Sequence, residues 1–132
     1  MTKPKAAIIG ISEQVLKKEE KSLVSKKCPF GIILFSRNIS SFEQVKKLTS
    51  SLRDAASWDI PIFIDQEGGK VQRLSGSDWL SFPPINIFGK IAKKSLKSAI
   101  EGTYLNHQLI ADDLTALGIN VNCSPCLDIY SK

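Results

Sequence analysis

The sequence predicts an α/β fold with a parallel sheet, of the type that builds about the first half of a (β/α)8 TIM barrel. Short, continuously apolar runs alternate with segments whose apolar residues recur at helical spacing. Polar residues follow the end of most of these runs. The chain has 132 residues, whereas a complete barrel needs about 250. Four strands and three helices are therefore expected.

The first strand is predicted over residues 6–10, where the run AAIIG suits a strand that is buried on both faces. Ser12 is expected to cap a first helix over residues 13–27. The apolar residues expected to face inward in that helix are Val15, Leu16, Leu23 and Val24.

A second strand is predicted over residues 31–35, followed by the polar triplet Ser36-Arg37-Asn38. Ser41 and Gln44 form a capping box, which predicts a helix over about residues 42–57. Its apolar stripe is Phe42, Val45, Leu48, Leu52 and Ala55. Pro61 then opens a third strand over residues 62–64, which leads into Asp65.

A long loop rich in Ser, Gly and Pro covers residues 74–86, and long loops at strand ends often bind ligands. One long helix is predicted over residues 91–117, ended by Gly118. A fourth strand is expected over residues 119–123. The helix stripe is Ala92, Leu96, Ile100, Thr103, His107, Ile110, Leu114 and Leu117.

This order of elements leaves one structural alternative, an open flavodoxin-like sheet. Gly10 is followed by Ile-Ser and not by a G-x-G-x-x-G loop, which argues against a nucleotide site. The net charge of +5 comes largely from spaced lysine pairs, which indicate solvated helix faces more than a nucleic-acid surface. No cofactor and no membrane partner are expected. The short N-terminal apolar run and three cysteines favour a cytoplasmic protein with reduced thiols.

The candidate site is the stretch over residues 62–73, in which an apolar strand ends at Asp65. Ligands bind at the carboxyl ends of parallel strands, because the loops converge there. Gly68 and Gly69 allow a sharp turn. Arg73 can fold back as a forked donor to hydroxyl or carboxylate oxygens.

The strings GIILFSRN (31–38) and IDQEGGKVQR (64–73) resemble family 3 glycoside hydrolases, and so do ALGINVN (116–122), Ser124-Pro125 and Leu127-Asp128. The similarity covers nearly the whole chain and is strongest to the bacterial β-N-acetylhexosaminidases. It predicts one domain, residues 1–132, as the N-terminal half of the catalytic barrel. The resemblance implies retaining release of terminal N-acetylglucosamine from peptidoglycan fragments in cell-wall recycling.

The resemblance also implies that Asp65 and Arg73 bind sugar hydroxyls. The family's K-H-F-P-G-H-G-type histidine loop and its later acidic nucleophile have no counterpart before Lys132. No catalytic residue is therefore assigned, and the chain alone is expected to be truncated and inactive. Asp65 and Glu67 are a disfavoured replacement pair, because Asp65 already has a binding role.

Two other functions stay open. The chain could be a non-catalytic sugar-binding module that self-associates or is complemented by a C-terminal half. It could also be a degenerate gene remnant.

Several residues receive ordinary structural interpretations. Cys123 and Cys126 have C-x-x-C spacing but are expected to be packing residues, since a zinc site needs about two more ligands. His107 is expected in the core or at its boundary with its ring nitrogens hydrogen-bonded, and Asp112-Asp113 on a solvated helix face. Asp128 is assigned no chemistry. Whether Trp79, Phe82, Pro83 and Pro84 form a sugar-stacking wall or a hydrophobic plug stays open.

Overall fold

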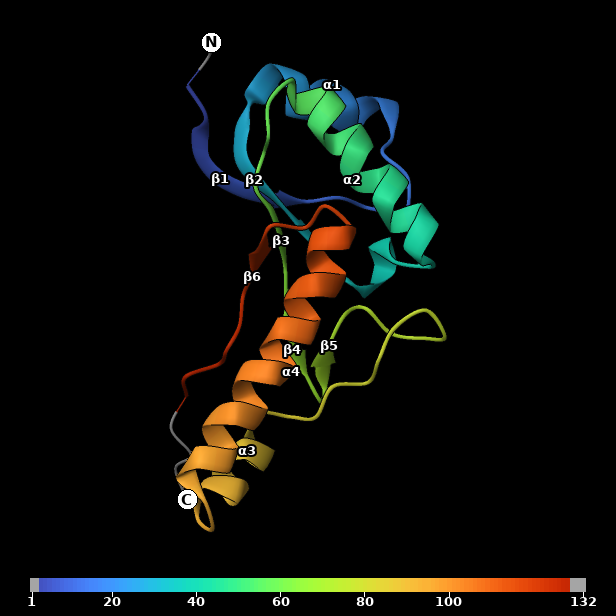
Figure 1. Ribbon diagram of the computed structural model, residues 1–132. Helices are drawn as coiled ribbons and strands as arrows, with labels where there is room; N and C mark the ends of the chain where they lie inside the picture. Colours follow the sequence, from blue (N-terminus) through green and yellow to red (C-terminus); the bar gives the residue numbers. More distant parts are fainter. Residues whose placement is uncertain (1–2, 129–132) are drawn as a thin grey trace.

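The computed structural model describes residues 3–128. Its main sheet has four parallel strands in the order β1-β2-β3-β6 (Figure 1): β1 (Lys5–Gly10), β2 (Pro29–Leu34), β3 (Ile62–Ile64) and β6 (Val121–Asn122). Each new strand is added beside the preceding one, without the reversal of strand order that open doubly wound sheets show. This is the strand order of a (β/α)8 barrel. The predicted half-barrel fold is confirmed, and the flavodoxin-like alternative is wrong.

The connections contain a short antiparallel hairpin and the helices. The elements are α1 (Lys18–Lys27), the 3-10 helix η1 (Ser36–Asn38), α2 (Phe42–Ala56), the hairpin strands β4 (Gln66–Gly68) and β5 (Val71–Gln72), α3 (Asn86–Ala92) and α4 (Leu96–Ala116). Helices α1 and α2 lie side by side, and the C-terminal half of α4 lies near β3 and β6 (Figure 1).

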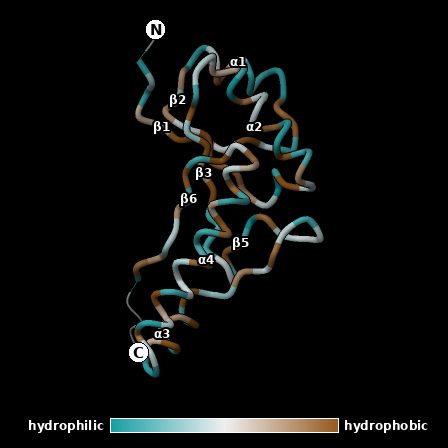
Figure 2. The backbone as a smooth tube through the Cα atoms, viewed as in Figure 1, coloured by the Kyte–Doolittle hydropathy of each residue, from teal (hydrophilic) through white to brown (hydrophobic). Residues whose placement is uncertain are grey.

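The core lies between one face of the sheet and the helices. Alternate strand residues point into it, because side chains on a strand alternate between the two faces. Figure 2 shows that hydrophobic residues lie along β1 to β3 at the centre of the molecule. The buried side chains of this cluster include Ile32, Leu34, Ile62 and Ile64 from the strands, Val45, Leu48 and Leu52 from α2, and Ile110 and Leu114 from α4.

The opposite face of the sheet is apolar but only partly covered. Ile33, Phe63 and Val121 are paired across the strands and are half-buried. Ile8 on the edge strand β1 is 47% exposed. The expectation that residues 6–10 are buried on both faces is wrong, because β1 is the edge of the sheet and pairs only with β2.

Helix α2 was predicted accurately from its cap and its stripe. Ser41 Oγ accepts a hydrogen bond from the Gln44 N–H at 3.3 Å, and the helix begins at Phe42. The Gln44 side chain accepts from the Ser40 N–H at 2.9 Å, one residue before the position that a capping box requires. The predicted stripe faces the core, with Phe42 at its half-buried edge.

Helix α1 begins at Lys18, five residues later than predicted, and Ser12 is not its cap. Glu20 explains the difference. Its carboxylate accepts from the Ser12 N–H at 2.8 Å and the Lys17 N–H at 3.0 Å, which holds the preceding residues as a folded loop. Val15 and Leu23 are exposed, contrary to expectation, whereas Val24 is buried and Leu16 packs against the core.

The single helix predicted over residues 91–117 is wrong, since α3 and α4 are separate. Ser95 has extended backbone angles (φ −154°, ψ 106°), and its Oγ accepts from the Ser98 N–H at 3.2 Å. This cap starts a new helix at Leu96, after α3 has ended at Ala92. Leu96 is 66% exposed, because the N-terminal half of α4 extends beyond the sheet (Figure 1). Within residues 3–128, no helix is both long and apolar enough to cross a membrane.

Candidate functional site

The candidate site lies at the carboxyl edge of the parallel sheet. Ile11, Phe35, Asp65 and Cys123 are the residues that directly follow the four strands. The last pair in the ladder between β3 and β6 is Ile64 with Asn122, and the Cys123 N–H donates to the Ile64 carbonyl at 2.8 Å. Asp65 and Cys123 are therefore neighbours at the end of the sheet.

Asp65 and Arg73 form an ion pair at this edge. The Arg73 Nη2 lies 2.9 Å from the Asp65 Oδ2, and the two side chains are 28% and 23% exposed. The pair is accessible enough to contact a ligand and shielded enough for charge-assisted hydrogen bonds to be strong. A carboxylate accepts and a guanidinium donates, so the pair can bind neighbouring hydroxyl groups, each of which does both.

Phe35 supports this pair from the neighbouring strand end. The guanidinium carbon of Arg73 lies 6.0 Å from the centre of the Phe35 ring, and that of Arg37 lies 4.6 Å from it. Such cation–π contacts limit where the guanidinium groups can lie. The Arg37 Nε also donates to the Ile11 carbonyl at 3.0 Å, which ties the end of β1 to the end of β2.

Phe35 and Arg37 were not assigned to the site from the sequence. The available signal was the polar triplet that follows β2, which marks a strand end on the same edge as Asp65. Asn38 from this triplet is fully buried, and its Nδ2 donates to the Glu13 carbonyl at 2.8 Å. It therefore secures the loop that follows β1.

The two glycines after Asp65 fold the hairpin against the following loop. Both have positive φ, +90° at Gly68 and +63° at Gly69. The Gly69 N–H donates to the Phe82 carbonyl at 2.8 Å, which ties this turn to the following loop. A Cβ at Gly68 would lie 2.5 Å from the Pro83 carbonyl oxygen. No side chain fits between these two segments.

The loop aromatic residues belong to the core. Trp79 and Phe82 are buried in the main hydrophobic cluster, so they do not form an exposed stacking wall. Pro84 is exposed and lies over Gly69. The stacking wall is therefore wrong for these two aromatic residues. The other interpretation, a plug over the barrel mouth, also differs from what is seen, because the loop packs in the core and against the hairpin.

The cysteines are not packing residues, contrary to expectation. Cys123 and Cys126 are both exposed free thiols. Partial burial, the adjacent Asp65 carboxylate, to which the thiol is hydrogen-bonded, and the charge of Glu67 raise the pKa of Cys123. The thiol beside Asp65 is therefore neutral. Among residues 3–128, no three His, Cys, Asp or Glu side chains lie together as a metal site would require.

The remaining polar candidates are His107, Asp112, Asp113 and Asp128, and the described contacts of Asp65 and Arg73 include none of them. His107 is half-buried at the boundary of the core, as predicted, with its Nδ1 2.9 Å from the Thr103 carbonyl oxygen. Its Nε2 is buried without a hydrogen-bond partner in the described part of the chain, so the expectation that both ring nitrogens are bonded is wrong. Asp112 is exposed, whereas Asp113 is half-buried. Burial first, and then the charge of Asp112, raise the pKa of Asp113. Asp128 is exposed.

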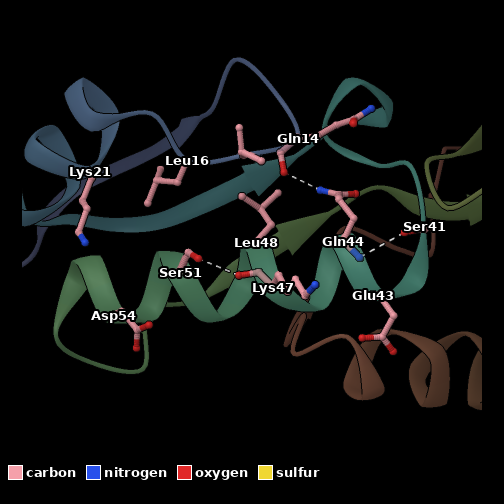
Figure 3. Close-up of a pocket in the computed structure, with 11 residues that line it drawn as sticks. Gln14, Leu16, Lys21, Ser41, Glu43, Gln44, Lys47, Leu48, Ser51 and Asp54 are labelled. Carbon is pink, nitrogen blue, oxygen red and sulfur yellow. Dashed lines mark hydrogen bonds between the residues drawn. The ribbon is translucent and has the colours of Figure 1, made fainter.

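A separate cavity of about 480 Å³ lies between α2 and the segment that leads into α1 (Figure 3). Glu43 and Lys47 line it from α2, and Gln14 lines it from the preceding loop. The Gln44 Nε2 donates to the Gln14 carbonyl at 2.6 Å and closes one end. Acidic and basic side chains are mixed in this cavity, and none of the strand-end residues lines it. It therefore adds nothing to the candidate site.

Residues 2–132 match the glycosyl hydrolase family 3 N terminal domain. A beta-hexosaminidase of Xylella fastidiosa (strain M23) is 29% identical over 122 residues, which are 92% of this chain and 36% of that protein. A beta-hexosaminidase of Xanthomonas oryzae pv. oryzae (strain KACC10331 / KXO85) is 30% identical with the same coverage. The chain thus spans about a third of the length of these relatives.

Solved structures give the same result. NagZ from Neisseria gonorrhoeae in complex with zinc ion has a TM-score of 0.90 and 31% identity, over 96% of this chain and 38% of that one. The same protein in complex with N-trifluoroacetyl-D-glucosamine has a TM-score of 0.88 and 31% identity, over 96% of this chain and 37% of that one. A family 3 beta-N-acetylglucosaminidase from Paenibacillus has a TM-score of 0.81 and 32% identity, over 92% of this chain and 23% of that one.

Proposed function

The chain belongs to glycosyl hydrolase family 3, and from this membership we propose that it supplies part of the sugar site of a β-N-acetylhexosaminidase. Asp65 and Arg73 form that part. The observation that supports the proposal is their ion pair at the carboxyl edge of a barrel-type sheet. Ligands bind at this edge in parallel α/β folds.

The proposed ligand is a saccharide with a terminal N-acetylglucosamine. The Neisseria gonorrhoeae NagZ structure with N-trifluoroacetyl-D-glucosamine supports a glucosamine with an acyl group on its nitrogen. We further propose peptidoglycan fragments as its source, cell-wall recycling as its role and the cytoplasm as its location. Fractionation of cells that express the chain tests the location, and recovery in the membrane fraction would contradict it.

We propose that the 132-residue chain binds this sugar without hydrolysing it. Retaining hydrolysis needs a nucleophile and a proton donor about 5–5.5 Å apart. The Asp65 carboxylate is engaged by Arg73. The single histidine of the sequence, His107, is on α4 and bonded to its own helix. A complementing C-terminal half would be needed to supply the reacting groups.

Calorimetric titration with N-acetylglucosamine tests binding. Asp65→Asn and Arg73→Met should each weaken it at least tenfold, whereas Glu43→Gln in the separate cavity should leave it unchanged. A chromogenic N-acetyl-β-glucosaminide tests hydrolysis, for which no turnover is expected. Turnover by the pure chain that disappears in Asp65→Ala would contradict the proposed inactivity.

A second candidate function is self-association with another copy of this chain. The protein exposes 8603 Å², whereas a compact monomer of 14.5 kDa exposes about 6,900 Å². The excess, about 1,700 Å² per chain, is roughly twice the area of about 800 Å² that each partner buries in a standard interface. Exposed apolar residues lie on both the sheet and α4, namely Ile8, Leu96, Ile100 and Tyr104.

Two four-stranded halves could also pair their free edges, β1 of one copy with β6 of the other, which would remove both open edges. Sedimentation over a range of concentrations tests this. A dimer that Ile100→Lys weakens would support self-association, and a monomer at every concentration would contradict it.

A further inference from the structure

Two amide side chains connect Asp65 to Arg73. Gln66, between them in the chain, is 1% exposed although its side chain is polar. A buried amide is stable only when its polar atoms are bonded. Both its side chain and its backbone are bonded to groups on either side of the candidate site.

The Gln66 side chain holds the backbone of Arg73. Its Oε1 accepts from the Arg73 N–H at 2.8 Å and from the Leu74 N–H at 3.0 Å. The same carboxamide reaches the Leu74 carbonyl through Nε2 at 3.4 Å. These bonds fix the point from which the Arg73 side chain turns back toward Asp65.

The Gln66 backbone is held by Asn122 on the neighbouring strand. The Asn122 Oδ1 accepts from the Gln66 N–H at 3.0 Å, and its Nδ2 donates to the Gln66 carbonyl at 3.0 Å. The last backbone bond of the ladder, from Cys123 to Ile64, lies just before this pair. Asp65 is therefore fixed on both sides, at Ile64 and at Gln66.

The remaining Arg73 atoms agree with a fixed guanidinium. Its Nη2 bonds Asp65, and its Nε is buried without a hydrogen-bond partner in the described part of the chain. The contacts that position this guanidinium are its bond to Asp65, the Phe35 ring 6.0 Å from its carbon, and the backbone bond from Arg73 to Gln66.

We propose that Gln66 and Asn122 are positioning residues, which set the Asp65–Arg73 pair in the arrangement that binds two neighbouring hydroxyl groups of a sugar. The inference rests on the proposed function for its ligand, but not for its geometry. Carboxylate and guanidinium groups that are held in place before binding lose less conformational entropy when the ligand arrives.

The test compares three variants of the 132-residue chain. Gln66→Met keeps the length of the side chain and removes the acceptor for Arg73. Asn122→Ala removes both bonds to Gln66. Asn120→Ala is the matched control, because Asn120 is the same residue type beside the same strand, and its Oδ1 accepts from the Ile62 N–H at 2.8 Å, far from the site.

The first readout is affinity for N-acetylglucosamine in folded protein. Gln66→Met and Asn122→Ala should bind at least tenfold more weakly, and Asn120→Ala should stay within twofold of the wild type. The second readout needs no sugar. The chemical shift of the Arg73 Nε–Hε group should differ from that of free arginine in the wild type and in Asn120→Ala. It should move toward the free value in Gln66→Met and in Asn122→Ala.

Each outcome decides a different point. Unchanged affinity and an unchanged Arg73 signal in both site variants would overturn the inference, and so would an equal loss in Asn120→Ala. If the wild type binds no sugar but its Arg73 signal responds as expected, the proposed function fails and the positioning role stands. If Gln66→Met does not fold, Asn122→Ala decides.

Discussion

Replacing the buried Gly68 with alanine should destabilise the protein more than replacing a glycine that has open space around it. Gly68 has φ +90°, and a Cβ there would meet the Pro83 carbonyl oxygen at 2.5 Å and the Phe82 carbonyl oxygen at 3.1 Å. The backbone conformation alone costs about 1–3 kcal/mol for an L side chain. Displacing a packed backbone segment adds about 1–3 kcal/mol. The expected loss for Gly68→Ala is therefore about 2–6 kcal/mol in the free energy of unfolding.

Two other glycines separate these contributions. Gly76 has φ +110° with nothing within 4 Å, so Gly76→Ala reports the conformational cost alone. Gly89 lies in α3 with nothing within 4 Å, so Gly89→Ala should stabilise the protein by about 0.5–1 kcal/mol. Urea unfolding of the three variants measures the differences. If Gly68→Ala costs no more than Gly76→Ala, the close packing of the hairpin against the Pro83 segment is refuted.

Three further predictions concern other parts of the chain. Thr49→Val should cost about 1–2 kcal/mol in urea unfolding, because the buried hydroxyl donates to the Leu117 carbonyl at 2.7 Å, whereas Ser51→Ala on the exposed side of α2 should change little. Burial and the charge of Asp112 raise the pKa of Asp113, so the charged form of Asp113 destabilises the fold. Asp113→Asn should therefore raise the free energy of unfolding at pH 7, and this increase should vanish as the pH falls below about 4, where Asp113 is protonated in both the folded and the unfolded state. Burial and Asp65 raise the pKa of the Cys123 thiol, so Asp65→Asn should accelerate alkylation of Cys123 by iodoacetamide at pH 8 and leave the rate at Cys126 unchanged. Equal alkylation rates at Cys123 before and after the substitution would contradict the contact between Cys123 and Asp65.

The sequence predicted best where local and tertiary preferences agree. In α2 the Ser41 cap and a stripe of apolar residues at helical spacing point to the same boundaries, and the helix lies there. In the same way, the apolar run over residues 62–64 predicted β3, and the acidic residue that follows it predicted the position of Asp65 at the end of that strand. Each of these features needs only neighbouring residues to specify it.

The errors lie where distant residues decide the structure. The Glu20 carboxylate accepts from the N–H of Ser12, eight residues earlier, so α1 begins later than predicted. The spacing of apolar residues gives no sign of this hydrogen bond. β1 is exposed because it is an edge strand, a property of the sheet and not of the run itself. The exposed Leu96 and Ile100 follow the same helical spacing as the buried Ile110 and Leu114, so the pattern could not show where α4 leaves the sheet.

The candidate site was predicted in part for the same reason. Asp65 and Arg73 lie within one short string, and the glycines between them indicate the return of the chain that brings them together. Phe35, Asn122 and Cys123 come from other strands. They meet Arg73, Gln66 and Asp65, respectively, only through the register of the sheet.

The most direct test of the account is an amide NMR titration of the chain with N-acetylglucosamine. The account predicts saturable shifts at Asp65, Gln66, Arg73 and Cys123, at the carboxyl edge of the sheet, and their loss in Asp65→Asn. No saturable shift at any sugar concentration, or shifts confined to Gln14, Glu43 and Lys47 in the cavity of Figure 3, would contradict it.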